Sequence, residues 1–373
     1  MSSHREFIQS LLEESSITVN GNSPVDIQIK NDEFYQRVLS QGSLGLGESY
    51  MDGWWDVDEL DEFFYLVLKD ELDKKIRTVM MALQVLKATV FNLGAKSKSF
   101  EIGEHHYDIG NDLYEKMLDK RMVYTCGYWK DANNLDQAQE NKLDLICRKI
   151  GLEKGMRILD IGCGWGSFCK FAAEKYGVKV VGVTVSKEQV ELSRKNCAGL
   201  DIEIKLQDYR DITGKFDRIV SLGMFEHVGY KNYREFMKIA SNSLSDDGLF
   251  LLHTIGGNKS VRTTDAWIGK YIFPNSMLPS IKQIARSIEG LFVMEDLHNF
   301  SADYDKTLMA WFNNFDKAWP DLKEKNKRYN DRFYRMWKYY LLACAGSFRA
   351  RKNQLWQIVL SKRGVLGGYD SIR

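Results

Sequence analysis

One stretch, Arg157 to Gly166 (RILDIGCGWG), constrains the fold of this 373-residue chain more than any other. Apolar residues flank Asp160 in the pattern of a short buried strand, and three glycines follow at every second position. The next residues, Ser167 to Lys175, place apolar side chains at helical spacing. A strand, a glycine turn and a helix start form the unit that binds nucleotides in doubly wound sheets. Glycine lets a ligand approach the backbone there, and the helix start offers free N–H groups.

The spacing of the glycines argues against a dinucleotide ligand. The dinucleotide fingerprint is G-x-G-x-x-G, with an acidic residue near the end of the second strand. Here Gly162, Gly164 and Gly166 are evenly spaced, and the second predicted strand, Val178 to Val185, ends without an acid. The turn resembles motif I of S-adenosylmethionine (SAM) methyltransferases, so SAM is the expected ligand. Another nucleotide, or a turn that is merely tight, is the alternative.

Predicted strands and helices alternate after Arg157, which indicates a doubly wound, mainly parallel sheet. Ligands of such sheets bind outside the carboxyl ends of the strands. Polar residues stand at five of these predicted ends: Asp160, Thr184, Asp208, Glu226 and His253. Their coincidence predicts a ligand site at this edge of the sheet.

The last hundred residues predict a mixture of helices and strands. A helix is expected over Ile281 to Ile288, and a strand is expected around Leu291 to Glu295. Two longer helices are expected over Asp303 to Trp319 and Leu322 to Ser347. Gln354 to Ser361 (QLWQIVLS) is expected to be a final edge strand.

The chain before the sheet predicts a separate, small and mostly helical domain. We expect this domain over residues 1–92, a polar linker over 93–104 and a catalytic domain over 105–373. Residues 41–47 (QGSLGLG) are expected to be a turn. Asp58 to Val90 predicts one or two amphipathic helices with four basic residues in their second half: Lys74, Lys75, Arg77 and Lys87. Such a helix can lie on an anionic membrane, or it can be a core helix with a solvated lysine face.

Composition excludes several classes of protein. Lysine plus arginine (52) nearly equals aspartate plus glutamate (51), so charge does not indicate a nucleic-acid partner. The first residues contain no secretory signal, and no stretch approaches the roughly 18 uncharged residues of a membrane span. Six scattered cysteines without a C-x-x-C motif predict free thiols in a reducing, cytoplasmic compartment. The HH pair at 105–106 and the EH pair at 226–227 lack the spacing of a metal site, so no metal is expected.

Each candidate catalytic residue also has a structural interpretation. Glu226 follows the fourth predicted strand, where it could cap the next helix or pair with a lysine. His253 ends an apolar strand and could be a core histidine, and Tyr304 could be a core aromatic. Cys126 and Cys344 could be buried for packing alone.

Ten motifs in order give a more specific resemblance, over roughly residues 100–365 and more loosely over the N-terminal domain. They are HHYDIGNDLY, YTCGYW, LDIGCGWG, GVTVSKEQ, QDYRD, MFEHVG, LLHTIG, KYIFPN, DYDKTLMAW and ACAGSFRARKNQLWQ. The chain resembles the bacterial cyclopropane-fatty-acyl-phospholipid synthases, a family that includes the mycolic acid cyclopropane synthases. The longer N-terminal domain is similar to that of the phospholipid-acting branch.

This resemblance implies a Rossmann-like class I SAM methyltransferase with a seven-stranded sheet. It implies transfer of a methylene group from SAM to a cis double bond of an unsaturated acyl chain, through a carbocation that a bound bicarbonate deprotonates. It assigns SAM binding to Tyr124, Thr125, Asp160, Gly162, Gly164, Gly166, Thr184, Ser186, Gln189, Asp208 and Tyr209.

The resemblance also assigns a set of residues around bicarbonate: Cys126 by its backbone N–H, Glu226, His253, Ile255 and Tyr304. Two anions repel, so Glu226 requires His253 as a shared partner or a proton between itself and bicarbonate. Cys344 matches a cysteine long assigned to the family's active site, but a thiolate has no step in this reaction. Its role is therefore left open.

The expected substrate is an unsaturated phospholipid in the bilayer, reached by peripheral association with the inner face of the membrane. No nucleic-acid partner is expected, and a homodimer is among the assemblies that the resemblance allows. One rival function is a SAM-dependent methyltransferase that makes a branched methyl product from the same cation. Another is a non-catalytic lipid-binding protein with a vestigial SAM fold, which would predict broken glycines or a lost Glu226, and the sequence retains both.

Overall fold

The computed structural model describes residues 2–75 and 110–373, which divide into two compact units. Of the described residues, the first unit comprises 2–75, Thr263–Pro274 and Tyr304–Asn353, and the second comprises 110–262, Asn275–Asp303 and Gln354–Arg373. This division differs from the expected boundaries of 1–92 and 105–373, because two later segments join the N-terminal helices. The linker expected over 93–104 lies outside the described residues.

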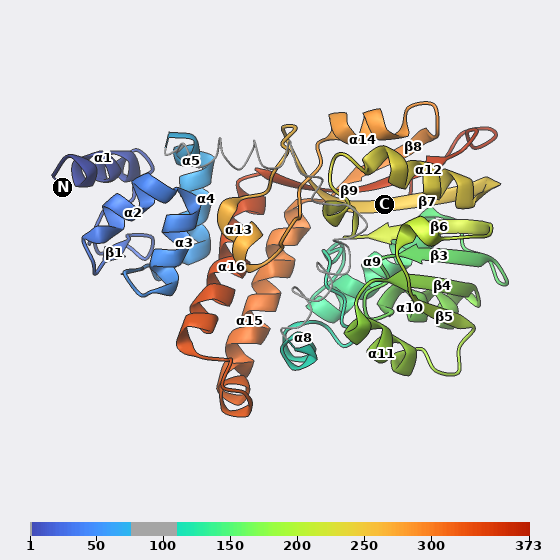
Figure 1. Ribbon diagram of the computed structural model, residues 1–373, viewed down its shortest axis with the longest axis horizontal. Coiled ribbons are helices and arrows are strands. Elements are labelled where there is room, and N and C mark those ends of the chain that lie inside the picture. Colours follow the sequence, from blue (N-terminus) through green and yellow to red (C-terminus); the bar gives the residue numbers. More distant parts are fainter. Residues whose placement is uncertain (1, 76–109) are drawn as a thin grey trace. The chain divides into compact units, whose positions relative to one another are not determined.

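The second unit is built on a seven-stranded sheet with the order β5-β4-β3-β6-β7-β9-β8 (Figure 1). Neighbouring strands from β5 to β7 are parallel, whereas β8 and β9 are antiparallel. The expected mainly parallel sheet is therefore confirmed. The strands are β3 (Arg157–Ile161), β4 (Lys179–Thr184), β5 (Ile202–Leu206), β6 (Phe216–Leu222), β7 (Leu244–Gly257), β8 (Val293–Asn299) and β9 (Asn353–Ser361).

The expectation that the last strand lies at an edge is wrong, because β9 lies between β7 and β8. Every residue of β9 after Asn353 is buried. The two glutamines that interrupt its apolar run bond inside the unit. Gln357 contacts His253, and Gln354 contacts Asn299 and Ser301. The polar residues in this strand therefore form internal hydrogen bonds rather than facing solvent.

Helices cover both faces of the sheet, and alternate strand residues supply a hydrophobic core on each side. Leu159 packs with α12 and α14, whereas its neighbour Ile158 packs with α9 and α10. Asn134, Ser186 and Ser280 cap α9, α11 and α14 with their side chains. The helices are α8 (Asn111–Met117), α9 (Leu135–Lys149), α10 (Ser167–Tyr176), α11 (Lys187–Asn196), α12 (Tyr233–Ser243) and α14 (Ile281–Ile288), with short 3-10 turns η1 (Tyr209–Asp211) and η2 (Phe225–His227).

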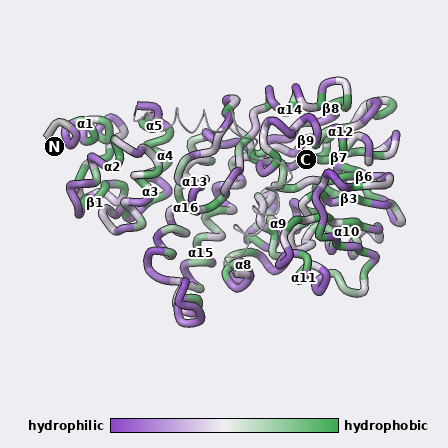
Figure 2. Tube along the Cα trace, viewed as in Figure 1, coloured by the Kyte–Doolittle hydropathy of each residue, from purple (hydrophilic) through white to green (hydrophobic). Residues whose placement is uncertain are grey.

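The first unit is a helical bundle with one small β pair. Its core includes the fully buried Trp55, whose ring packs against Phe34, Tyr50 and Phe63. The turn between α15 and α16 is strongly hydrophilic (Figure 2). The elements are α1 (Ser2–Glu13), β1 (Gln28–Ile29), α2 (Glu33–Gln41), α3 (Ser43–Met51), β2 (Trp55–Asp56), α4 (Leu60–Lys69), α5 (Leu72–Lys75), α13 (Ala266–Tyr271), α15 (Ala302–Lys325) and α16 (Asp331–Arg349).

The turn expected over residues 41–47 is wrong, because α3 begins at Ser43 directly after Gly42. The glycines of this stretch serve close packing. A Cβ on Gly45 would lie 2.4 Å from the carbonyl oxygen of Arg37, and one on Gly47 would lie 2.3 Å from the Trp267 ring. Helix α3 can approach its neighbours because these positions lack side chains.

Candidate active site

A cavity of about 170 Å³ lies at the carboxyl ends of β3, β4, β5 and β6. Ten of the eleven residues predicted to bind SAM line it, from four separate segments: Tyr124, Thr125, Asp160, Gly162, Gly164, Thr184, Ser186, Gln189, Asp208 and Tyr209. The polar strand ends therefore gather as the sheet topology predicts. Gly166 does not line the cavity.

The glycine turn has a backbone that favours glycine at all three positions. Gly162, Gly164 and Gly166 have φ values of 86°, 55° and 81°. A Cβ on Gly162 would also lie 2.6 Å from the Met224 side chain, and one on Gly166 would lie 2.9 Å from the sulfur of Cys197. Gly162 and Gly164 thus shape the cavity, whereas Gly166 lets the start of α10 pack closely.

The carboxyl group of Asp160 lies at the cavity without full hydrogen bonding. Its Oδ2 accepts from the thiol of Cys169 at 3.3 Å, but its Oδ1 has no partner among the described residues. Burial raises the pKa of Asp160 to about 7. A cationic ligand group beside Oδ1 would stabilise the ionised form.

The other polar strand ends are held by local hydrogen bonds. The hydroxyl of Thr184 donates to Oε1 of Gln189 at 2.8 Å, and Ser186 accepts from the Gln189 amide at 3.3 Å. The carboxylate of Asp208 accepts from the amide of Arg210 at 2.9 Å and pairs with its guanidinium at 3.1 Å. These bonds orient the side chains toward a preformed binding site.

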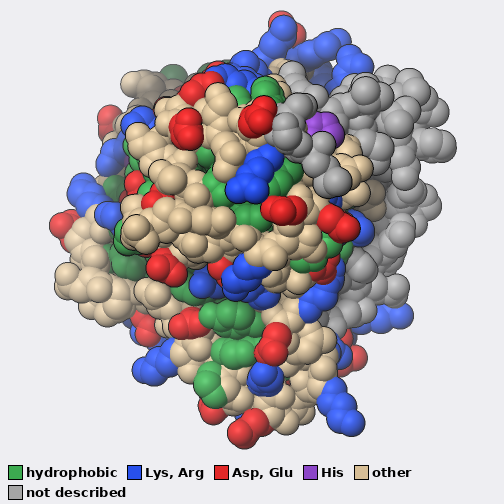
Figure 3. Space-filling model, turned by 90° about the vertical axis from the view of Figure 1, so that its left-hand side faces the viewer, with side chains coloured by type: hydrophobic (Ala, Val, Ile, Leu, Met, Phe, Trp, Pro, Cys, Tyr) green, Lys and Arg blue, Asp and Glu red, His purple; other side chains and the backbone are tan. Residues whose placement is uncertain are grey.

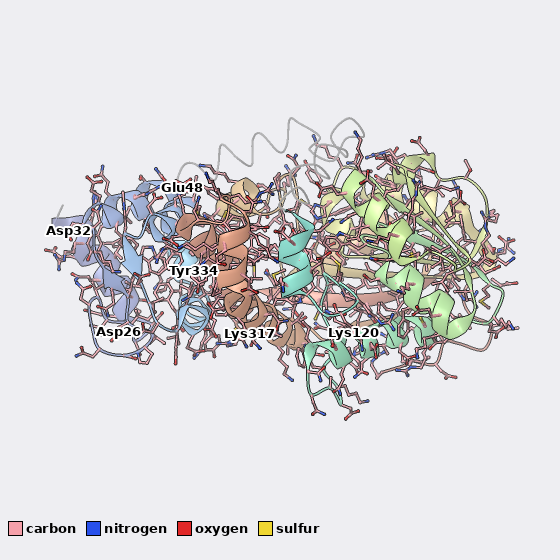
Figure 4. All side chains as sticks on the ribbon, turned by 90° about the horizontal axis from the view of Figure 1, so that it is seen from below. Asp26, Asp32, Glu48, Lys120, Lys317 and Tyr334 are labelled. Atoms are coloured by element: carbon pink, nitrogen blue, oxygen red, sulfur yellow. The ribbon has the colours of Figure 1, made fainter. Side chains whose placement is uncertain are left out.

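The segment before the sheet forms one wall of the cavity and is fixed to α9. The amide of Lys120, a residue labelled in Figure 4, donates to Asp136 at 3.0 Å, and its ammonium pairs with Glu140 at 3.1 Å. Farther along, the amide of Tyr128 donates to the carbonyl of Ala138 at 2.8 Å. The segment that contains Tyr124 and Thr125 is therefore held at both ends.

Some ionisable cavity residues were not predicted from the sequence. Lys142 on α9 and His227 on η2 both line the cavity. Burial lowers the pKa of His227 to about 4, so its imidazole is neutral near pH 7. A signal for Lys142 was present in the sequence, because this lysine stands one helical turn from the apolar residues Ala138, Leu145 and Ile146.

A second buried cluster lies where β6 and β7 end side by side. The amide of Gly223 donates to the carbonyl of His253 at 2.9 Å, and the amide of Ile255 donates to Oε1 of Glu226 at 2.6 Å. The ring of Phe300 lies 6.0 Å from that of His253. The structure therefore places Glu226 in contact with Ile255, and His253 lies two residues earlier on the same strand. Cys126, also in this unit, is fully buried and its thiol donates to the carbonyl of Gly127 at 3.2 Å.

Unpaired polar atoms distinguish this cluster from an ordinary core. Among the described residues, Oε2 of Glu226 and Nε2 of His253 have no hydrogen-bond partner. Burial raises the pKa of Glu226 to about 7 and lowers that of His253 well below its usual value, a direction that the charges of Lys142 and Lys149 reinforce. Near pH 7 the cluster therefore contains a neutral imidazole and a carboxyl group poised between its two forms.

Tyr304 and Cys344 belong to the first unit. The ring of Tyr304, on α15, is buried and stacks on Phe348 with the ring centres 4.5 Å apart. Burial raises the pKa of Cys344, on α16, to about 12, so its thiol stays protonated at neutral pH. A nucleophilic thiolate at Cys344 is not favoured by these surroundings.

Among the described residues, no group of three or more histidine, cysteine, aspartate or glutamate side chains is arranged to hold a metal ion. The histidines at 105–106 lie outside that part of the chain.

The sheet order and the lined cavity define a class I SAM-dependent methyltransferase. A family model described as mycolic acid cyclopropane synthetase matches residues 95–358, more than half of the chain. The chain therefore belongs to the mycolic acid cyclopropane synthetase family.

Individual relatives agree with this assignment. A cyclopropane-fatty-acyl-phospholipid synthase of Escherichia coli strain K12 is 54% identical over 96% of this chain and 93% of its own. A probable fatty acid methyltransferase of Pseudomonas putida is 37% identical over 74% of this chain and 72% of its own. A solved mycolic acid cyclopropane synthase, CmaA1 in complex with SAH and CTAB, is 32% identical with a TM-score of 0.64, covering 70% of this chain and 98% of that one.

Proposed function

We propose that this chain transfers a methylene group from SAM to the cis double bond of unsaturated acyl chains in membrane phospholipids. The observation that supports this most is the buried cluster of Glu226 and His253, two titratable groups with unpaired atoms in a member of this family. The 54% identity to a cyclopropane-fatty-acyl-phospholipid synthase over nearly the whole chain supports the phospholipid substrate.

The reaction requires two bond-forming steps. The π electrons of the alkene attack the methyl carbon of SAM, and the sulfur–carbon bond breaks with its electron pair going to sulfur. A carbocation then remains on the acyl chain. One C–H bond of the new methyl group breaks, its electron pair closes the three-membered ring, and the proton leaves to a base.

The protein must protect this cation from competing nucleophiles. Glu226 and His253 are only 5% and 1% exposed, which limits the access of water to the cluster. His253 stays neutral, and the ring of Phe300 beside it offers an aromatic face. These groups favour loss of a proton over trapping of the cation.

We propose bicarbonate as the bound base, because this cluster contains two buried polar atoms without a partner among the described residues. Oε2 of Glu226 can share a proton with one oxygen of such an ion, and Nε2 of His253 can donate to another when Nδ1 accepts from Gln357 at 3.3 Å. The pKa of Glu226 near 7 allows the proton that keeps two anions from repelling each other. When bound, bicarbonate supplies the acceptor for the proton lost in ring closure.

The activity of the enzyme should fall in carbonate-free buffer and return when bicarbonate is added. Full activity without bicarbonate would remove this ion from the proposal.

A branched methyl product is the second candidate, because a relative at 37% identity is a probable fatty acid methyltransferase. The two candidates differ only in how the cation is resolved. A cyclopropane arises when the new methyl group loses a proton, whereas a branched chain arises when hydride reduces the cation or a neighbouring carbon loses the proton.

One incubation separates these outcomes. The purified chain is mixed with SAM that carries an isotopic label in its methyl group and with vesicles of unsaturated phosphatidylethanolamine. Mass spectrometry and proton NMR should find the label in cyclopropane rings of the acyl chains, and vesicles of saturated lipid should stay unlabelled. Labelled branched chains would favour the second candidate, and unlabelled lipid would contradict both.

The proposed substrate requires peripheral attachment to the inner face of a membrane. No helix in the described part of the chain is both long and apolar enough to span a bilayer. Of the four basic residues proposed to dock, Lys74 pairs with Glu71 and Lys75 with Glu14, while Arg77 and Lys87 lie outside the described residues. Figure 3 shows a face on which acidic and basic side chains are interspersed. Docking by a wholly basic face is not supported there, so the attachment is proposed to combine charge with apolar contact.

A further inference from the structure

Lys142 has surroundings that are unusual for a lysine. Its side chain lies on the buried face of α9 with no solvent exposure, at the wall of the SAM cavity. Among the described residues, no carboxylate oxygen lies within 4.0 Å of its ammonium. A buried cation without a contact ion pair is costly, so an anionic group nearby would be strongly stabilising.

The ammonium of Lys142 makes one hydrogen bond in this part of the structure, to Oγ1 of Thr125 at 2.8 Å. One turn earlier on α9, Nε2 of Gln139 donates to the carbonyl oxygen of Thr125 at 2.7 Å. Two buried residues of α9 therefore hold the backbone and the side chain of Thr125.

The rotamer of Thr125 is fixed on its other side by Gly223. A Cβ on Gly223 would lie 2.7 Å from Cγ2 of Thr125, so the methyl group of Thr125 occupies the space that this glycine leaves. With its methyl group toward Gly223 and its oxygen toward Lys142, the hydroxyl has a defined position at the cavity wall.

The direction of the hydrogen bond follows from the chemistry of the partners. A lysine ammonium has three donors and no acceptor, so the oxygen of Thr125 must accept. The hydroxyl proton of Thr125 must then point elsewhere, and none of the described residues accepts it. Thr125 is half-buried at the cavity, so a ligand there can receive this proton.

We propose that Lys142 is a positioning residue for SAM, which makes the Thr125 hydroxyl a hydrogen-bond donor to the carboxylate of the methionine end. This inference rests on the proposed function, because it takes SAM as the ligand. The carboxylate is the only anion that SAM brings, and it would also lie near the charge of the buried ammonium. The neighbouring Asp160 offers its unpaired Oδ1 to a cation, so the wall has groups for both charges of the methionine zwitterion.

The protonation of Lys142 agrees with this role. Burial lowers its pKa to about 8, while the charges of Asp119, Cys126 and Asp160 act in the opposite direction. The ammonium therefore predominates at pH 7. The carboxylate of Asp119 accepts from the amides of Val123 at 2.8 Å and Arg121 at 3.0 Å. Its acceptor capacity is thus partly used by the backbone rather than by Lys142.

The test compares two ligands that differ only in the carboxylate. Calorimetry measures the affinities of the full chain for SAM and for decarboxylated SAM, which keeps the adenosine, the sulfonium and the amino group. In Lys142→Met, SAM should bind roughly 10–100-fold more weakly, the scale of one charge-assisted hydrogen bond. Decarboxylated SAM should bind the variant within about twofold of wild type, because it makes no contact that depends on the hydroxyl proton.

Two variants of Thr125 keep the test valid if removing Lys142 prevents folding. Thr125→Val should lose SAM affinity and spare decarboxylated SAM, whereas Thr125→Ser keeps the hydroxyl and should restore the preference for SAM. The double variant Lys142→Met/Thr125→Val should bind SAM no more weakly than Thr125→Val alone, because both changes remove the same bond.

Lys149 provides the matched control. It is also buried on α9, two turns later, but its ammonium contacts His298 at 3.0 Å and it does not line the cavity. Lys149→Met should leave the ratio of the two affinities unchanged. If Lys142→Met weakens the binding of SAM and of decarboxylated SAM equally, or weakens neither, this inference is overturned. Failure of wild type to bind SAM at all would instead overturn the proposed function.

Discussion

Glu226 combines deep burial with an unpaired oxygen, and this combination predicts a large effect on turnover. Replacing it with glutamine keeps the shape and the bond from the Ile255 amide but removes the ability to exchange a proton. Glu226→Gln should lower turnover by roughly 10²-fold or more, the scale of a positioned acid–base group. SAM affinity should stay nearly unchanged, because Glu226 does not line the SAM cavity. Near wild-type turnover in a folded variant would contradict a role in proton transfer.

The raised pKa of Glu226 also predicts how stability depends on pH. Burial shifts this pKa from 4.5 to about 7, so the folded state binds more protons than the unfolded state between these values. The contribution of Glu226 to stability therefore falls as the pH rises from 4.5 to about 7 and stays constant above. Relative to wild type, Glu226→Gln should gain on the order of 3 kcal/mol over this window. Thermal unfolding of both proteins at pH 5 and pH 8 measures it; an equal difference at both values would show that Glu226 titrates normally.

At the same scale, the sequence predicts side chains that belong to a recognised motif but not those that support them. Thr125 was expected at the SAM site through its motif, and the structure places it at the cavity. Its supports, Gln139 and Lys142, come from a helix whose pattern reports burial alone. The direction of a hydrogen bond between a lysine and a hydroxyl becomes visible only when the two side chains are placed together.

Among the elements, the local sequence pattern predicted the bounds of a strand or helix where these bounds depend on residues of that element alone. Helix α14 spans Ile281–Ile288, as its apolar spacing predicts, and β4 ends at Thr184, one residue before the predicted strand end. Local pattern failed for α3 and β9, whose glycines and glutamines resemble turn and edge residues. In both cases the cause is a partner distant in sequence: Trp267 for Gly47, and His253 for Gln357.

The packing of α16 on α4 gives a prediction at this scale. A Cβ on Gly346 would lie 2.5 Å from the carbonyl oxygen of Asp61 and 2.8 Å from the amide nitrogen of Tyr65, which are backbone atoms that cannot turn aside. Gly346→Ala should therefore destabilise the first unit by about 1–3 kcal/mol, despite the higher helix propensity of alanine. Denaturant unfolding measures this loss. Ser347→Ala, at the next position of the helix, is the control and should change stability little.

SAM affinity provides a second readout for Gly346→Ala. All residues that line the SAM cavity belong to the second unit, so the affinity should be preserved at temperatures where the variant is folded. Unchanged stability would show that the two helices can separate at little cost.

At the scale of the whole molecule, the first unit cannot be removed by cutting the chain before the sheet. A chain that begins near Phe100 would lack α3 and α4 but keep α13 and α16, which pack against them. The ring of Tyr339 on α16 contacts Tyr50 and Phe64, at 5.6 Å and 5.1 Å between ring centres. Such a chain would expose these aromatic faces, so its loss of activity would not report on membrane docking. The sequence suggested a separable N-terminal domain because the contacts that close it come from segments more than two hundred residues later.

Docking to a membrane is therefore better tested by charge reversal in the full chain. Reversing Lys74, Lys75, Arg77 and Lys87 to glutamate should weaken binding to anionic vesicles, because each basic residue near such a surface contributes about 1 kcal/mol. Cosedimentation with vesicles that contain phosphatidylglycerol measures the binding. The difference from wild type should shrink as salt rises, since screening weakens the wild-type attraction itself. The partners Glu71 and Glu14 already neutralise part of the charge, so the effect should be smaller than four unpaired basic residues would give.

The matched control reverses four other basic residues, on α15 and the turn after it: Lys317, labelled in Figure 4, Lys323, Lys325 and Lys327. Both variants change the net charge of the chain equally, so a general electrostatic effect would weaken both. If only the first weakens vesicle binding, docking involves the helices that follow Asp58. If only the control does, the membrane surface belongs to the α15–α16 turn, whose hydrophilic tip follows the aromatic residues of α15, Trp311 and Trp319. Equal binding by wild type and both variants at low salt would mean that apolar contact, rather than these charges, attaches the protein to its substrate.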